Sequence, residues 1–138
     1  MIFPYTEYSD TGKSVFRPTV RVVFSCKGTS LIVGHALVDT GADKTLLPLS
    51  MATAFGFTFD LEKEMEMWGG AGGGSFPVYR SPMPIEYKIE QQGFRPIVWK
   101  APVYFTLNQP TILLGHDGFL EKFNLLFKGK DRLLELSV

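Results

Sequence analysis

The segment Ala36-Leu37-Val38-Asp39-Thr40-Gly41-Ala42-Asp43 is the most informative part of the sequence for the fold and for the candidate reactive group. Apolar residues lead directly into a carboxylate, a hydroxyl and a glycine, which is an unusual way for a buried strand to end. An ionised carboxylate without a partner is costly to bury, so Asp39 is a candidate reactive group. Thr40 can hydrogen-bond across a tight turn, and Gly41 allows another backbone or a substrate to approach the carboxyl group. An ordinary β-turn after a core strand is the alternative interpretation.

The same tripeptide occurs a second time, at Asp10-Thr11-Gly12. Polar residues flank this copy on both sides, and no strand is expected to lead into it. It is therefore predicted to lie in a loop, because Asp, Thr and Gly are ordinary turn residues. Context assigns the candidate reactive group to Asp39 and not to Asp10.

Length and composition predict a single, mostly β domain. A chain of 138 residues buries one core and is too short for two. The 14 Gly, 9 Pro and 12 Phe, with β-branched and aromatic residues in short runs, favour strands joined by many turns. Lysine and arginine together number 14, as do aspartate and glutamate, so we expect neither a nucleic acid nor a membrane as partner.

Few residues are available for disulfide or metal chemistry. Cys26 is the single cysteine and cannot form an internal disulfide. His35 and His116 are far apart in the sequence and belong to no Cys/His cluster, so no metal site is expected. The first residues lack a basic start followed by a long apolar run, and no segment is long enough to span a membrane, which predicts a cytoplasmic location.

Hydrophobic patterns place the expected elements around the Asp39 segment. Residues 85–89 alternate strictly between apolar and charged, which is typical of a half-buried strand. For residues 57–67 a strand is expected, but the sequence also suits a helix. The other expected elements are strands at 20–26, 31–38 and 111–115, short helices at 49–55 and 117–123, and a closing hairpin of 125–127 with 133–138.

The glycine-rich segment 67–76 reads Met-Trp-Gly-Gly-Ala-Gly-Gly-Gly-Ser-Phe. One interpretation is a flexible linker, but a cut here leaves two pieces too small to hold separate cores. The other interpretation is a mobile hairpin tip, because strands are expected on both sides. Such a tip can fold over a cleft and present backbone groups to a ligand.

Three stretches taken together resemble the retropepsins, the retroviral-type aspartic proteases. They are Leu37-Val38-Asp39-Thr40-Gly41-Ala42-Asp43, Gly69-Gly70-Ala71-Gly72-Gly73 and Ile112-Leu113-Leu114-Gly115. The resemblance covers residues 20–127, and small cellular members of the family look closer overall than viral ones. One departure is His116, which follows Gly115 where viral members usually carry an arginine that braces the position of Asp43.

The resemblance implies a mostly β, single-domain retropepsin-like acid protease fold over residues 1–138. The expected architecture is a closed, barrel-like sheet with a flap hairpin and one or two short helices. Residues 1–19 would be an N-terminal extension, 20–127 the core and 128–138 a C-terminal strand.

The resemblance also implies roles for individual residues. Asp39 would be the catalytic carboxylate, supported by Thr40, Gly41 and Ala42, and Thr40 would hydrogen-bond to its mate in a partner chain. The implied substrate-binding positions are Asp43, Trp68, Gly69, Gly70, Ala71, Gly72 and Gly73, with Ala71 at the flap tip.

The implied activity is that of an aspartic endopeptidase acting on protein or peptide substrates. Such an enzyme needs two carboxyl groups that share a proton, and this chain offers one in the right context. The second would come from another copy, so a homodimer is expected, with no metal and no organic cofactor. The alternative is a catalytically silent module that keeps the fold for dimerisation or for peptide binding.

Overall fold

The computed structural model describes residues 1–70 and 72–138, and within them the chain is mostly β. The helical elements are α1 (Leu49–Ala54) and one 3-10 turn, η1 (Leu120–Lys122). The strands are β1 (Ile2–Pro4), β2 (Thr6–Asp10), β3 (Lys13–Arg17), β4 (Thr19–Cys26), β5 (Thr29–Val38), β6 (Leu46–Pro48), β7 (Glu66–Gly69), β8 (Ser75–Arg80), β9 (Ile85–Ile89), β10 (Ile97–Ala101), β11 (Tyr104–Thr106), β12 (Leu113–Leu114), β13 (Asn124–Lys128) and β14 (Leu133–Ser137).

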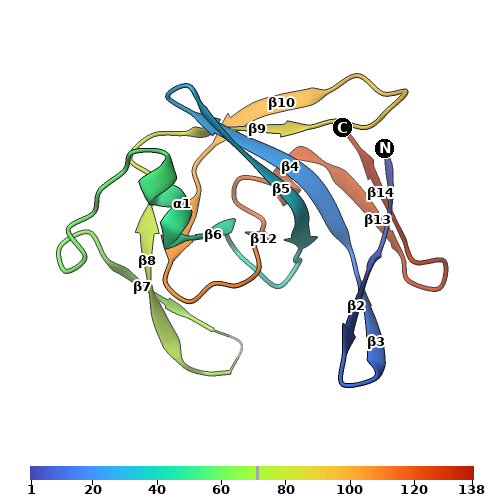
Figure 1. Ribbon diagram of the computed structural model, residues 1–138, viewed down its shortest axis with the longest axis horizontal. Helices are drawn as coiled ribbons and strands as arrows, with labels where there is room; N and C mark the ends of the chain where they lie inside the picture. Colours follow the sequence, from blue (N-terminus) through green and yellow to red (C-terminus); the bar gives the residue numbers. More distant parts are fainter. Residues whose placement is uncertain (71) are drawn as a thin grey trace.

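A sheet of nine strands forms the body of the molecule, in the order β10-β9-β4-β5-β12-β6-β11-β8-β7. Its longest strands, β4 and β5, form an antiparallel hairpin that crosses the molecule (Figure 1). Strand β9 buries Ile85, Tyr87 and Ile89, so the alternation expected at residues 85–89 is confirmed. These side chains pack with Phe24 and other apolar residues in one continuous core, whose burial stabilises the sheet.

The sheet is open, and the expected closed barrel is wrong. Its two end strands are β10, which pairs with β9, and β7, which pairs with β8. Within residues 1–70 and 72–138 these two end strands do not pair with each other. The β7–β8 hairpin projects away from the body instead of curling back toward β10 (Figure 1). The sheet therefore keeps two free edges, one of them on this hairpin.

A second sheet joins the two ends of the described chain, in the order β1-β14-β13. Strand β14 lies between the other two strands, so the apolar C-terminal strand is fully paired. On the outer side of β1, the side-chain amide of Gln91 forms hydrogen bonds with both the backbone N–H and the backbone carbonyl of Ile2. The Ile2 N–H donates to Gln91 Oε1 at 3.0 Å, and Gln91 Nε2 donates to the Ile2 carbonyl at 2.6 Å.

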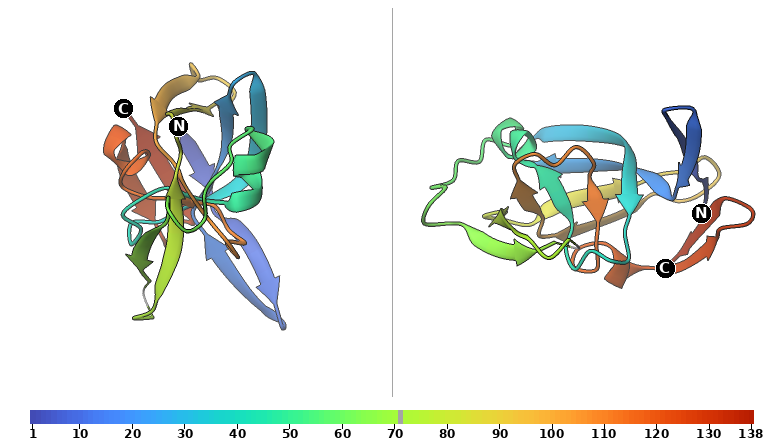
Figure 2. Two further views of the ribbon diagram at one scale, coloured as in Figure 1. Left: turned by 90° about the vertical axis from the view of Figure 1, so that its left-hand side faces the viewer. Right: turned by 90° about the horizontal axis from the view of Figure 1, so that it is seen from below.

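Residues 6–17 form a separate hairpin of β2 and β3, which projects on the same side as the β7–β8 hairpin (Figures 1 and 2). Thr11 and Gly12 form its tip and have positive φ angles of 47° and 78°, the pattern of a tight two-residue hairpin turn. The expectation that no strand leads into this Asp-Thr-Gly copy is wrong. The copy is a hairpin tip, and its polar flanks are exposed strand residues.

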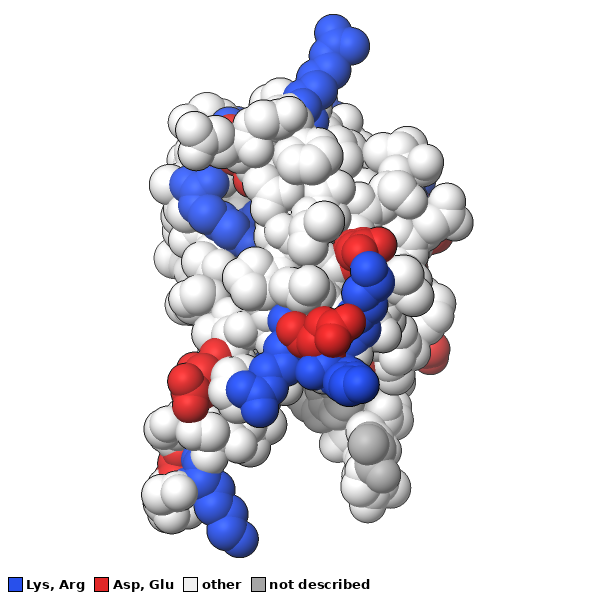
Figure 3. All heavy atoms as spheres, turned by 90° about the vertical axis from the view of Figure 1, so that its right-hand side faces the viewer, with Lys and Arg blue, Asp and Glu red and all other residues white. Residues whose placement is uncertain are grey.

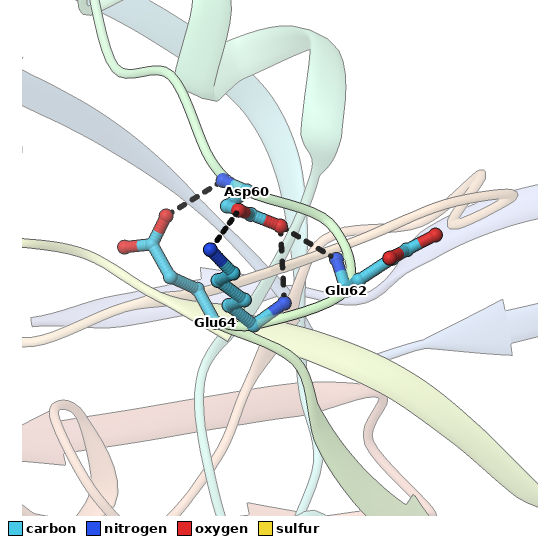
Figure 4. A network of polar contacts seen from close by, with 4 residues as sticks. Asp60, Glu62 and Glu64 are labelled. Atoms are coloured by element: carbon cyan, nitrogen blue, oxygen red, sulfur yellow. Dashed lines mark hydrogen bonds and ion pairs between the residues drawn. The ribbon is translucent and has the colours of Figure 1, made fainter.

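The expected strand at residues 57–67 is also wrong over most of its length, because β7 begins only at Glu66. A capped turn occupies the middle of this segment (Figure 4). Asp60 Oδ1 accepts hydrogen bonds from the backbone of Glu62 and of Lys63, both at 3.1 Å, and the Asp60 N–H donates to Glu64 Oε2 at 2.7 Å. Local side-chain bonds of this kind compete with a strand ladder.

The face formed around β13 and β14 carries charge of both signs. Basic and acidic side chains lie next to one another there, without a broad area of one sign (Figure 3). Lys128 of β13, for example, pairs with Glu135 of β14. Among the described residues, no helix is long and apolar enough to cross a membrane.

Candidate active site

Asp39 lies where the chain leaves β5, and a distant part of the sequence holds it there. Strand β12 runs parallel to the end of β5, pairing Leu113 with Leu37 and Leu114 with Val38. The Asp39 N–H donates to the Leu114 carbonyl at 3.1 Å, one residue beyond this ladder. The backbone of the candidate catalytic residue is therefore fixed by two strands that the sequence separates by more than seventy residues.

The turn after Asp39 orients its carboxylate. The Gly41 N–H donates to Asp39 Oδ1 at 2.9 Å, and the Ala42 N–H donates to the Asp39 carbonyl at 3.2 Å. A Cβ added at Gly41 would lie 3.2 Å from Oδ1, so glycine leaves this oxygen room. Asp39 is half-buried, while Thr40 is exposed, and no hydrogen bond of the Thr40 side chain is formed within the described residues.

The segment that follows β12 holds this turn in place through hydrogen bonds. The Ala42 carbonyl accepts the backbone N–H of His116 at 2.9 Å and lies 3.1 Å from its Nδ1. The Asp43 carbonyl accepts the backbone N–H of Asp117 at 2.8 Å. Because a carbonyl only accepts, His116 Nδ1 carries the proton in this contact. The two chain segments are thus joined by main-chain hydrogen bonds.

His116 therefore contacts the backbone at Ala42 and not the carboxylate of Asp43. Within the described residues, neither a hydrogen bond nor an ion pair joins the side chains of His116 and Asp43, and Asp43 is exposed. The sequence left open whether His116 takes over the bracing of Asp43, and the structure shows no such side-chain contact within the described residues. The turn is held instead through its carbonyl groups, which is a role that a neutral imidazole can fill.

The described residues of the glycine-rich segment belong to the β7–β8 hairpin, where the sequence predicts a flap. Trp68 pairs with Phe76, and Gly69 pairs with Ser75. Beyond these pairs the Gly70 N–H donates to the Gly74 carbonyl at 2.8 Å. The predicted flap tip, Ala71, lies outside the described residues. Strands on both sides of the glycines confirm the hairpin interpretation against the linker.

One pocket of about 280 Å³ lies between the Asp39 turn and the base of the flap hairpin. Seven of the predicted site residues line it, namely Asp39, Gly41, Ala42, Asp43, Trp68, Gly69 and Gly70. Thr40, Gly72 and Gly73 are described but do not line it. The structure thus places the Asp39 carboxylate and the base of the β7–β8 hairpin on one cavity.

Five further residues line the pocket and were not predicted from the sequence: Lys44, Leu46, Phe76, Gln109 and Leu113. Phe76 could have been found, because it lies across the hairpin from Trp68. Lys44 directly follows the Asp39 segment, but its direction depends on Trp68 and on Tyr104, which is sixty residues away. No group of three or more potential metal ligands occurs among the described residues.

No protein-family model matches the chain, and no curated protein matches it. Among solved structures it is similar to the EIAV protease complexed with the inhibitor HBY-793, with 23% sequence identity and a TM-score of 0.43. That match covers 78% of this chain and 86% of the protease chain.

Proposed function

We propose that this chain is an aspartic endopeptidase that acts as a homodimer on protein or peptide substrates. The observation that carries the proposal is the placement of Asp39. Its carboxylate is half-buried, is oriented by the Gly41 N–H and opens onto a pocket whose other wall is a glycine-rich hairpin. A fixed carboxylate and a covering hairpin are what hydrolysis within a shielded cleft requires.

The second carboxyl group comes from another copy of the chain. Asp43 lines the same pocket, but it is exposed, and no hydrogen bond joins it to Asp39 within the described residues. A dyad that shares one proton needs its two carboxyl groups in direct contact. Two copies related by a twofold axis supply two Asp39 side chains, and the exposed Thr40 is free to meet its mate across that axis.

In this dimer the two carboxyl groups divide the chemistry. One Asp39 is ionised and removes a proton from water, and the water oxygen attacks the carbonyl carbon of the peptide bond. The other Asp39 is protonated and donates a hydrogen bond to the carbonyl oxygen. Proton transfer to the leaving nitrogen completes the cleavage.

The closer likeness to cellular members and the cytoplasmic location remain predictions from the sequence.

The first test replaces Asp39 by asparagine, which keeps the size of the side chain and removes its ability to exchange the shared proton. Wild-type protein is incubated with a peptide library, with and without a statine-type inhibitor, and the products are identified by mass spectrometry. We expect Asp39→Asn to lower the cleavage rate by about a hundredfold or more.

The matched control is Asp10→Asn, in the second Asp-Thr-Gly copy at the tip of the β2–β3 hairpin, and it should cleave like wild type. Cleavage by Asp39→Asn at the wild-type rate would refute the proposal. Peptide binding without cleavage by the wild-type protein would favour the alternative of a silent binding module.

A further inference from the structure

The pocket beside Asp39 contains one cation. Among the described residues that line it, Lys44 alone has a basic side chain, and most of the other side chains are apolar, including Leu46, Trp68 and Leu113. Lysine carries a strongly hydrated charge, which is costly to hold half-buried beside apolar side chains unless a partner compensates for it. A ligand of this pocket is therefore expected to carry a negative charge that compensates for the ammonium group of Lys44.

Two aromatic rings hold the ammonium group in position. Lys44 Nζ donates a hydrogen bond to the phenol oxygen of Tyr104 at 2.7 Å. It lies 4.3 Å from the ring centroid of Trp68 and 4.3 Å from that of Tyr104, and the two rings are 5.0 Å apart. The side chain is thus anchored between the flap strand β7 and strand β11, and its loss of conformational freedom occurs before any ligand binds.

No protein carboxylate neutralises this ammonium group. Within the described residues Lys44 forms no ion pair, although Asp39 and Asp43 line the same pocket. Its hydrogen-bonding partner is a neutral phenol, so two of its three N–H groups are left for other acceptors. A carboxylate is the acceptor that adds charge compensation to hydrogen bonding.

We propose that this pocket binds an acidic side chain of the substrate, glutamate or aspartate, with Lys44 as the residue that selects it. The carboxylate accepts a hydrogen bond from the ammonium group, and the methylene carbons lie against Trp68 and Leu113. This inference rests on the proposed peptidase function. It adds to that function the substrate class, peptides with an acidic residue close to the bond that is cut.

The test compares two random octapeptide libraries that differ only in carrying glutamate or glutamine at the same positions. Each is digested with wild type, Lys44→Met, Lys44→Arg and Lys44→Glu. We expect wild type and Lys44→Arg to cleave glutamate peptides about five- to twentyfold faster than glutamine peptides. Lys44→Met should lose this preference, and Lys44→Glu should reverse it in favour of the glutamine peptides.

Two controls separate specificity from a structural role. If Lys44 only joined the flap to the Asp39 turn, Lys44→Met would slow the cleavage of both libraries equally and leave their ratio unchanged. Lys100→Met removes the same charge from the exposed face of β10, away from the pocket, and should keep the wild-type ratio. The preference of wild type should also disappear below about pH 4, where the glutamate of the peptide becomes protonated.

Binding distinguishes failure of this inference from failure of the proposed function. Immobilised Asp39→Asn protein should retain the glutamate library over the glutamine library, and Asp39→Asn with Lys44→Met should retain them equally. Cleavage without any glutamate preference would overturn the role of Lys44 and leave the peptidase proposal intact. Equal retention of the two libraries by the Asp39→Asn protein would overturn the role of Lys44 even if no peptide were cleaved.

Discussion

At Gly115 a single added methyl group would collide with the turn that carries Asp39. A Cβ at this position would lie 2.6 Å from the Ala42 carbonyl oxygen and closer still to that of Lys44. Both atoms belong to backbone that hydrogen bonds hold in place, so neither can move cheaply. We therefore expect Gly115→Ala to lower the free energy of unfolding by about 2 to 4 kcal/mol, measured by urea denaturation, and to reduce cleavage further by displacing the turn.

Gly129 provides the matched control for this substitution. It lies in the turn between β13 and β14, and an added Cβ meets nothing within 4 Å. Gly129→Ala should change stability by less than about 1 kcal/mol. Equal unfolding midpoints for the two variants would contradict the close packing inferred at Gly115.

The sequence grouped those candidate site residues whose placement depends on the local chain, and the structure brings seven of them to one pocket. Asp39, Gly41 and the base of the β7–β8 hairpin lie in short segments whose residue types are sufficient to predict their local conformation. Lys44 was missed because its orientation depends on Trp68 and Tyr104, which reach it only through the fold. The partner of His116 could not be predicted for the same reason, since spacing does not distinguish a side-chain partner from a backbone partner.

Among the elements, those with a clear period and clear ends were predictable. Strands at 20–26 and 31–38 correspond to β4 and β5, and the helix at 49–55 corresponds to α1, which Pro48 precedes and Gly56 follows. The capped turn at Asp60 and the β2–β3 hairpin were missed. Most of their residues are polar or exposed and show no regular apolar periodicity, and local hydrogen bonds help to determine their form.

The contact between β9 and the segment that follows β10 predicts a dependence of stability on alkaline pH. Burial raises the pKa of Tyr87, with further contributions from the charges of Asp117 and Glu121. The Tyr87 hydroxyl donates to the Pro102 carbonyl at 3.0 Å. Above about pH 10 the unfolded chain releases the phenol proton while the folded chain keeps it. The free energy of unfolding should therefore fall as pH rises beyond this value.

Tyr87→Phe tests this dependence. At pH 7 the variant should be less stable by about 1 kcal/mol, because it loses the hydrogen bond to Pro102. Above about pH 10 the free energy of unfolding of the variant should fall less steeply with pH than that of wild type. Tyr8→Phe, on the β2–β3 hairpin outside the core, is the control. Parallel stability curves for wild type and Tyr87→Phe across this range would exclude the buried phenol as the cause.

For the whole molecule, the proposal that each chain supplies half of an active site predicts that activity depends on association. Specific activity should fall on dilution as the dimer separates, with the dimer measured by sedimentation. Mixing wild type with an equal amount of Asp39→Asn should lower activity per wild-type chain to about half after subunit exchange, because mixed dimers have one ionisable Asp39. Asp10→Asn mixed in the same way should leave it unchanged. Monomers with undiminished activity would rule out a shared site.

The amide of Gln91 has a consequence for how copies of this chain can associate. It occupies the outward-facing groups of Ile2, and Pro4, the next residue of β1 that faces outward, has no N–H to donate. Within the described residues, a strand can be added to the terminal sheet only beside β13. A sheet with two usable edges can polymerise without limit, whereas one with a single usable edge is complete after one addition. One glutamine side chain thus limits pairing through the terminal sheet to a single closed pair.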